Sequence, residues 1–160
     1  MRRLRRFVVR PWREQVLTAE AAVWLAAAEA LLAVLPFRRI ASRLGTTMDG
    51  GTFKAQPPDA RHQGRARRVG HAVARAARHV PWPARCLAQA MAAKAMLWRR
   101  GIPSTLHFGM ALAGAPVGPR MQAHAWLTVG TIGVVGVAAA RGFTVLARFT
   151  HEAADARPLQ

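Results

Sequence analysis

Cys86 is the one cysteine of the chain, and it has the surroundings of a nucleophile. The run PWPAR, residues 81–85, leads directly into an apolar stretch with helical spacing, so Cys86 falls in the first turn of a predicted helix. The unpaired N–H groups at a helix start carry partial positive charge, which favours the thiolate and lowers the pKa of a cysteine there. We expect Arg85 to act in the same direction.

A nucleophilic cysteine needs a base that takes its proton and later protonates the leaving group, and histidine is the usual base. His124 lies in QAHAW, residues 122–126, where the apolar neighbours predict a strand. A histidine on such a strand is able to face Cys86 across a cleft. The competing interpretation is structural, because a lone cysteine is commonly a small buried hydrophobe and six histidines make some pairing a matter of chance.

The remaining histidines are weaker candidates for the base. His107 also lies on a predicted strand, and we interpret it as a wall or core residue. His62 and His151 fall in a loop and a tail, and His71 and His79 on a basic helix. No paired ligand spacing indicates a metal, and no glycine-rich loop carries the lysine and helix of a phosphate site. We therefore predict neither a metal nor an organic cofactor.

The elements that must position Cys86 and His124 follow from the apolar periodicity. Helices are predicted within residues 1–44, interrupted at Pro36, and over residues 65–79 and 84–100. After Gly101 and Pro103 the period shortens, which predicts strands over residues 104–111, 123–129, 132–137 and 143–149. Helices followed by an antiparallel sheet indicate an α+β domain.

The same patterns divide the chain into four segments. Residues 1–45 are predicted to form a helical N-terminal arm, and residues 46–64, with Gly-Gly and Pro-Pro, a linker or long loop. Residues 65–152 would hold the core, and residues 153–160 a tail. A chain of 160 residues with 52% hydrophobic residues suffices for one packed core and excludes a disordered protein. One cysteine also excludes a disulfide framework.

The chain is strongly basic, with 24 Lys and Arg against 7 Asp and Glu and a net charge of +17. All but Lys54 and Lys94 of the basic residues are arginine, which is typical of a GC-rich bacterial genome. A solvated basic surface explains this charge as well as an acidic partner does, such as nucleic acid, anionic lipid or an acidic peptide. The five tryptophans are scattered among apolar positions, so nucleic-acid binding is disfavoured.

Residues 16–35 are apolar over a length that would span a bilayer. Glu20 and Glu29 lie within this stretch, where a membrane would oppose them, so we interpret it as an amphipathic helix packed on a protein core. The charged opening resembles a secretory signal, but Arg10 and Pro11 interrupt it. We expect a cytoplasmic protein, and the flanking arginines leave peripheral membrane contact as an open alternative.

Three motifs carry a family resemblance that covers nearly the whole chain. They are WPARCLAQA at 82–90, LWRRGIPSTLHFG at 97–109 and AHAWL at 123–127. Together with the arginine-rich front that ends in LPFRR at 35–39, they resemble the stand-alone B proteins of lasso peptide biosynthesis, transglutaminase-like cysteine peptidases that remove the leader from the precursor. The resemblance implies a papain-like core in which the helix that carries the cysteine packs on a small antiparallel sheet.

By this resemblance Cys86 is the nucleophile and His124 the general base and acid of a Cys–His–Asp triad. It implies three partners: the lasso precursor peptide, a separate winged-helix protein that recognises the leader, and an asparagine-synthetase-like cyclase that closes the core with ATP. Gln122 and Gln89 are weak candidates for support of the oxyanion. Trp82, His107 and Trp126 are weak candidates for the walls of the substrate cleft.

The third member of the triad departs from the family pattern. An acid is expected in or just after the strand that follows His124, but residues 134–140 read VVGVAAA. A backbone carbonyl or a side-chain amide is the alternative group that would orient the histidine. The missing acid also supports a second hypothesis, a non-catalytic scaffold that binds the precursor or its partner proteins. A basic module for nucleic acid or a membrane surface is the third hypothesis.

Overall fold

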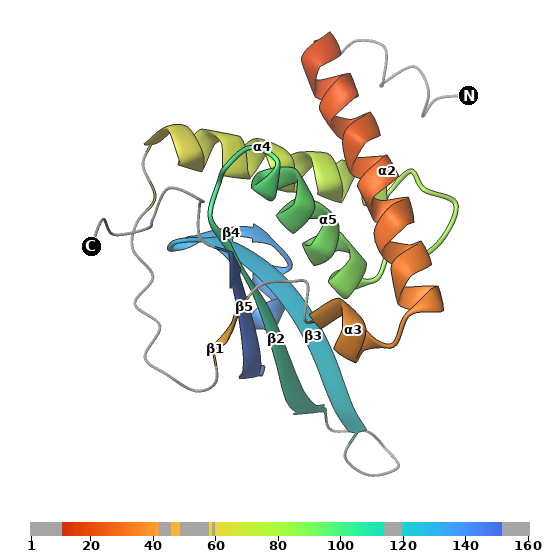
Figure 1. Cartoon of the computed structure of the whole chain (residues 1–160), viewed down its shortest axis with the longest axis vertical. Coiled ribbons are helices and arrows are strands. Elements are labelled where there is room, and N and C mark those ends of the chain that lie inside the picture. The colour runs from red at the N-terminus through yellow and green to blue at the C-terminus, as the bar shows by residue number, and fades with distance from the viewer. Residues whose placement is uncertain (1–10, 42–45, 49–57, 59, 114–119, 152–160) are drawn as a thin grey trace.

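A computed structural model describes residues 11–41, 46–48, 58, 60–113 and 120–151 (Figure 1). The helices are α2 (Trp12–Val34), α3 (Phe37–Ala41), α4 (Ala60–Ala77), α5 (Cys86–Trp98) and the short 3₁₀ helix η1 (Val137–Ala140). The strands are β1 (Thr46–Met48), β2 (Ser104–Ala113), β3 (Arg120–Val129), β4 (Ile132–Val135) and β5 (Thr144–His151). Helices α2, α4 and α5 lie together on one side of the sheet, which confirms the predicted α+β class.

The five strands form one sheet in the order β1-β5-β2-β3-β4, with every neighbouring pair antiparallel. The long β2 is central, and Leu106 lies opposite Leu127 of β3 and Phe149 of β5. These three side chains are buried in the core with the helices, so the residues that alternate with them face the other side of the sheet.

Helix α5 is the centre of the helical layer, in contact with α2, α4, β2 and β3. Its alanines and the larger Met96 and Leu97 are buried, so this helix is apolar on nearly all sides. The helix ends at Trp98, and the turn that follows it closes at the predicted stop, Gly101, whose φ of +64° is left-handed; the N–H of Ile102 donates back to the Leu97 carbonyl.

Lys94 fastens this helix to the sheet from within the core. Its side chain is buried, and Nζ donates to the carbonyls of Ser104 and Phe149, each at 3.0 Å. Burial lowers the pKa of Lys94 to about 8, because the charged form loses hydration. The two bonds join α5 to the first residue of β2 and to β5.

Helix α2 is long and apolar enough to cross a membrane by length and composition, yet it is docked on the domain. Its three glutamates each pair with an arginine of another helix or of a helix end. The pairs are Glu14 with Arg75, Glu20 with Arg100, and Glu29 with Arg85. The hydrogen bond from Arg100 holds the pKa of Glu20 below its ordinary value despite partial burial.

The predicted boundaries need correction at two places. The linker over 46–64 was wrong at both ends, because β1 occupies residues 46–48 and α4 begins at Ala60. The pairing of β1 with β5 joins residues about a hundred positions apart and leaves no local signal. Gly64 lies within α4 on an open face of the helix. The predicted tail over residues 153–160 lies outside the described residues.

Docking of α2 gives a first test, since Leu25 is fully buried against the core while Val23 on the opposite side is 68% exposed. We expect Leu25→Ala to lower the free energy of unfolding by about 3 kcal/mol, because it leaves a cavity between α2 and the core. Val23→Ala should change it by less than about 0.5 kcal/mol. Denaturant unfolding measures both, and equal effects would mean that α2 is a free arm.

Candidate active site

Cys86 is the first residue of α5, as the sequence predicts, and its side chain is half-buried. It packs against the edge of the hydrophobic core, together with Ala84 and Leu87. Arg85 is the N-cap with extended backbone, and its carbonyl accepts the N–H of Gln89 at 3.0 Å. The thiol therefore lies at the positive end of a helix that the core holds rigidly.

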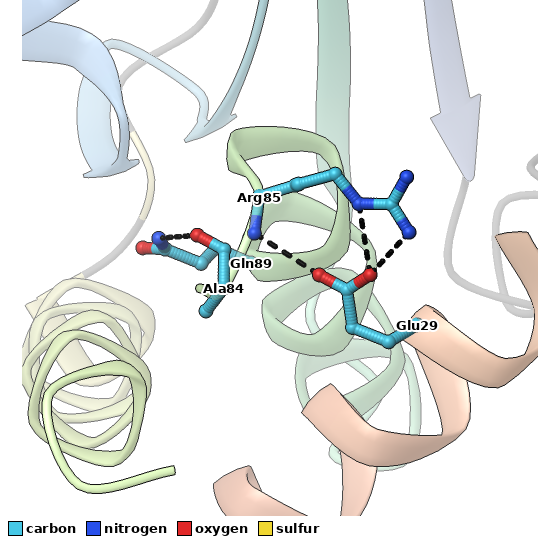
Figure 2. A network of polar contacts seen from close by, with 4 residues as sticks. All are labelled: Glu29, Ala84, Arg85 and Gln89. Carbon is cyan, nitrogen blue, oxygen red and sulfur yellow. Dashed lines mark hydrogen bonds and ion pairs between the residues drawn. The ribbon is translucent and has the colours of Figure 1, made fainter. Parts of the chain in front are cut away.

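Glu29 of α2 holds the start of α5 in place (Figure 2). One of its carboxylate oxygens accepts the backbone N–H of Arg85 at 3.0 Å, and the other accepts the Nε–H and an Nη–H of the same guanidinium. Burial works against the charged carboxylate, but these bonds from Arg85 hold the pKa of Glu29 below its ordinary value. The expectation that Arg85 promotes the thiolate is thus corrected, because a carboxylate neutralises its charge.

Gln89 has a different task from the one predicted. Its Nε2 donates to the Ala84 carbonyl at 2.9 Å, so the amide braces the loop that leads into α5 (Figure 2). An amide held in this way is not free to follow a developing oxyanion. Gln122 is exposed on β3, and Trp82 is exposed just before α5. Trp82 therefore remains a candidate for the wall of the substrate cleft.

His124 lies on β3 with its ring half-buried, and its Nε2 is 2.8 Å from the Gly136 carbonyl oxygen. A carbonyl only accepts hydrogen bonds, so Nε2 carries a hydrogen. In the neutral ring, Nδ1 then holds the lone pair that a general base requires. The Gly136 carbonyl therefore fixes both the tautomer and the orientation of the imidazole.

Gly136 directly follows β4, where the family pattern leads one to expect an acid. Its φ is +75°, a left-handed conformation that glycine adopts without strain. A Cβ at this position would lie 2.8 Å from the Ala125 carbonyl oxygen and 3.3 Å from Nε2 of His124. The close approach of backbone to imidazole thus depends on the missing side chain. The sequence shows that the acid is missing and allows a backbone carbonyl in its place, but it does not indicate which carbonyl.

A stack of rings lies behind His124 on β2 and β3. The Trp126 ring lies between His124, at 5.9 Å and 19°, and His107, at 5.3 Å and 7°. Phe143, which the sequence did not single out, packs against His124 at 5.2 Å with its ring tilted by 47°. These contacts leave the imidazole little freedom to rotate. Trp126 is buried, so it supports His124 from behind instead of lining a cleft.

His107 is a core residue, which is one of the two roles that the sequence leaves open for it; its burial does not fit the other role, the wall of a substrate cleft. Its side chain is buried and its Nε2 lies 2.9 Å from Oγ1 of Thr128. Burial, helped by the charges of Arg148 and Lys94, lowers the pKa of His107 to about 4. The ring is therefore neutral at pH 7, and burial keeps it away from substrate.

The elements that carry Cys86 and His124 pack against each other, since α5 contacts β3. Ala125 and Leu127 of β3 point into the core beneath the helices, so His124 and Trp126 start from the other face of the strand. β4 pairs with β3 from Leu127 onward, which places His124 beyond the end of β4. Among the described residues, the His124 ring bonds to Gly136 and not to the Cys86 thiol.

Comparison with protein families matches residues 31–148 to the transglutaminase-like superfamily. This match covers about three quarters of the chain. The protein belongs to the transglutaminase-like superfamily. No curated protein and no solved structure matches the chain at a significant level. The superfamily commonly contains cysteine peptidases, and its match includes α5 with Cys86 and β3 with His124.

The buried His107 predicts how the stability of this transglutaminase-like domain depends on pH. Its folded pKa of about 4 lies below the ordinary value, so its contribution is complete above about pH 6.5 and falls as pH drops toward 4. The free energy of unfolding that His107 contributes, and that is lost over this pH range, is about 3 kcal/mol. Denaturant unfolding measures the free energy of unfolding at each pH between 7 and 4.5. This free energy should fall less steeply with decreasing pH for His107→Gln than for the wild type or for His71→Gln on the exposed face of α4. Equal slopes in all three would contradict the account.

Proposed function

We propose that this protein is a cysteine peptidase that removes the leader from a ribosomally made lasso peptide precursor. The observation that carries the proposal is the pair of prepared groups: a thiol at the start of α5 and an imidazole whose Nε2 is held by the Gly136 carbonyl. Transglutaminase-like membership supports the peptidase chemistry. The resemblance of the motifs around both residues to lasso B proteins supports the choice of substrate.

In the proposed reaction, Nδ1 of His124 takes the proton of the Cys86 thiol as sulfur attacks the scissile carbonyl. The tetrahedral intermediate collapses when His124 gives this proton to the leaving amine, which is the new N-terminus of the core peptide. The leader remains as a thioester on Cys86. A water, deprotonated by His124, then hydrolyses the thioester and restores the thiol.

This chemistry requires the thiol and the ring to approach each other. Hydrogen bonds between catalytic groups are commonly loose without substrate and tighten in the complex. His124 lies beyond the end of β4, with its ring bonded to the Gly136 carbonyl. We infer that the precursor, presented by the leader-recognition protein, completes the site.

Gly136 stands in for the usual acid only in part. A carbonyl fixes the tautomer as a carboxylate does, but it carries no full negative charge to stabilise the imidazolium. The proposed enzyme is therefore a dyad with an orienting carbonyl. We expect slower turnover than a triad would give, which suits an enzyme that processes one precursor for a partner cyclase.

Mass spectrometry of the cognate precursor, incubated with the recognition protein, tests the nucleophile. The wild type should release the leader, and Cys86→Ala should release none. His124→Ala should slow release by about a hundredfold or more, because the proton transfers lose their base. Met121→Ala, a change at a 66% exposed residue on the same strand, serves as the control and should leave the rate within about twofold.

Other outcomes point to different functions. Release by both wild type and Cys86→Ala would move the nucleophile elsewhere and contradict the proposal. If neither protein cleaves the precursor but both bind it, the peptidase is refuted and the scaffold hypothesis takes its place. The orientation of His124 by a carbonyl and the lack of its bond to Cys86 among the described residues are the observations that favour the scaffold.

Gly136 and Gly142 form a matched pair for testing the orienting carbonyl. Both have positive φ, +75° and +88°, but a Cβ at Gly142 would meet nothing within 4 Å. Both alanine variants should lose about 1 kcal/mol of stability from backbone strain. We expect Gly136→Ala alone to lower kcat about tenfold or more, because the new Cβ displaces the carbonyl from His124. Equal kcat in the two variants would contradict the assigned role.

A further inference from the structure

Helix α2 presents an apolar face along its whole length on the side away from the domain. The exposed residues recur every three to four positions and include Trp12, Val16, Ala19, Val23, Ala30 and Val34. A helix of this length extends about 34 Å. In Figure 1, α2 lies at the outside of the helical layer, and its N-terminal half projects beyond α4 and α5. We call this surface the α2 apolar face.

The α2 apolar face carries no charged side chain between Val16 and Val34, because the glutamates of the helix lie outside this face and pair with arginines. Glu14, Glu20 and Glu29 each bind an arginine of the domain. At about 100° per residue, Glu20 and Glu29 lie about 80° and 100° to either side of the line through Trp12. Their ion pairs thus run along the two flanks of the face.

The ends of the face and the flank beside Glu20 are basic. Arg99 lies next to Glu20, which is already paired with Arg100, and keeps 59% of its side chain exposed, whereas Arg85 on the other flank is neutralised by Glu29. The sequence places five arginines in residues 1–10 before the helix, and Arg38 and Arg39 are exposed just after it. A cavity of about 490 Å³ beside the N-terminal half of α2 is lined by Arg13, Arg65, Arg68, Arg75 and Arg100 with Glu14.

We propose that α2 binds the surface of an anionic membrane, lying in its plane with the apolar face among the acyl chains. An apolar stripe bordered by arginines is the pattern of an interfacial helix, in which buried apolar area and attraction to acidic headgroups add. Arg13, Arg38, Arg39 and Arg99 are exposed at the ends and on one flank of the face, where lipid phosphates would meet them. The inward ion pairs keep α2 attached to the domain, so it lies on the membrane and does not span it.

A second copy of the chain is the less favoured occupant of the face. Two such faces would bring their flanking arginines together, and the net charge of +17 opposes that approach. An acidic lipid surface instead attracts these arginines. Charge complementarity therefore decides between the two occupants.

Sedimentation of the full chain with lipid vesicles tests the proposal. We expect binding to vesicles of phosphatidylcholine with phosphatidylglycerol to be at least about tenfold stronger than to phosphatidylcholine alone, and to weaken in high salt. Val23→Glu should lower binding about tenfold or more. Leu112→Glu, the same change at a 75% exposed residue near the end of β2, should bind like the wild type.

Three results would overturn the proposal. The first is equal binding by Val23→Glu and the wild type, or no binding by either. The second is a wild-type dimer in solution that Val23→Glu dissociates, which would assign the face to a second copy. The third is protein that alkaline carbonate fails to extract, which would indicate a helix across the bilayer. Circular dichroism of each variant separates loss of binding from loss of fold, and Val16→Glu provides a second substitution on the face.

Discussion

The start of α5 depends on a contact made by another helix, the binding of Arg85 by Glu29 of α2. This carboxylate accepts both the backbone N–H and the guanidinium of the residue that precedes Cys86. Just beyond the other end of α5, the two carboxylate oxygens of Glu20 accept bonds from the Arg100 guanidinium, so α2 holds both ends of the helix that begins at Cys86. Lys94 ties the middle of that helix to the sheet. These contacts add to the packing of α5 on the core and on β3 in fixing the position of the thiol.

On the sheet, the corresponding constraint is the close approach of Gly136 to His124. The left-handed glycine brings its carbonyl to Nε2, and the stack of Trp126 and His107 supports the ring from behind. A backbone carbonyl is thereby able to do the orienting work of an acid while contributing no charge. The superfamily match places both constraints within one fold, and the proposed peptidase uses the groups that they hold.

The sequence predicts those features that depend on local spacing. Cys86 at a helix start, His124 on a strand, the break at Pro36 and the end of α5 at Gly101 follow from periodicity and from Pro and Gly. Features set by contacts between distant residues escaped it: β1 paired with β5, Arg85 neutralised by Glu29, and His107 buried behind Trp126. In each of these, tertiary packing selects one partner among several that the local sequence allows.

The central claim is that Cys86 forms a covalent bond to the leader, and trapping this thioester tests it most directly. The precursor and its recognition protein would be mixed with the wild type, quenched in acid within the first turnover, and analysed as intact protein by mass spectrometry. The account predicts an adduct equal to the leader fragment less one water, mapped by digestion to Cys86. Leader release without an adduct on Cys86, or an adduct on another residue, would contradict it.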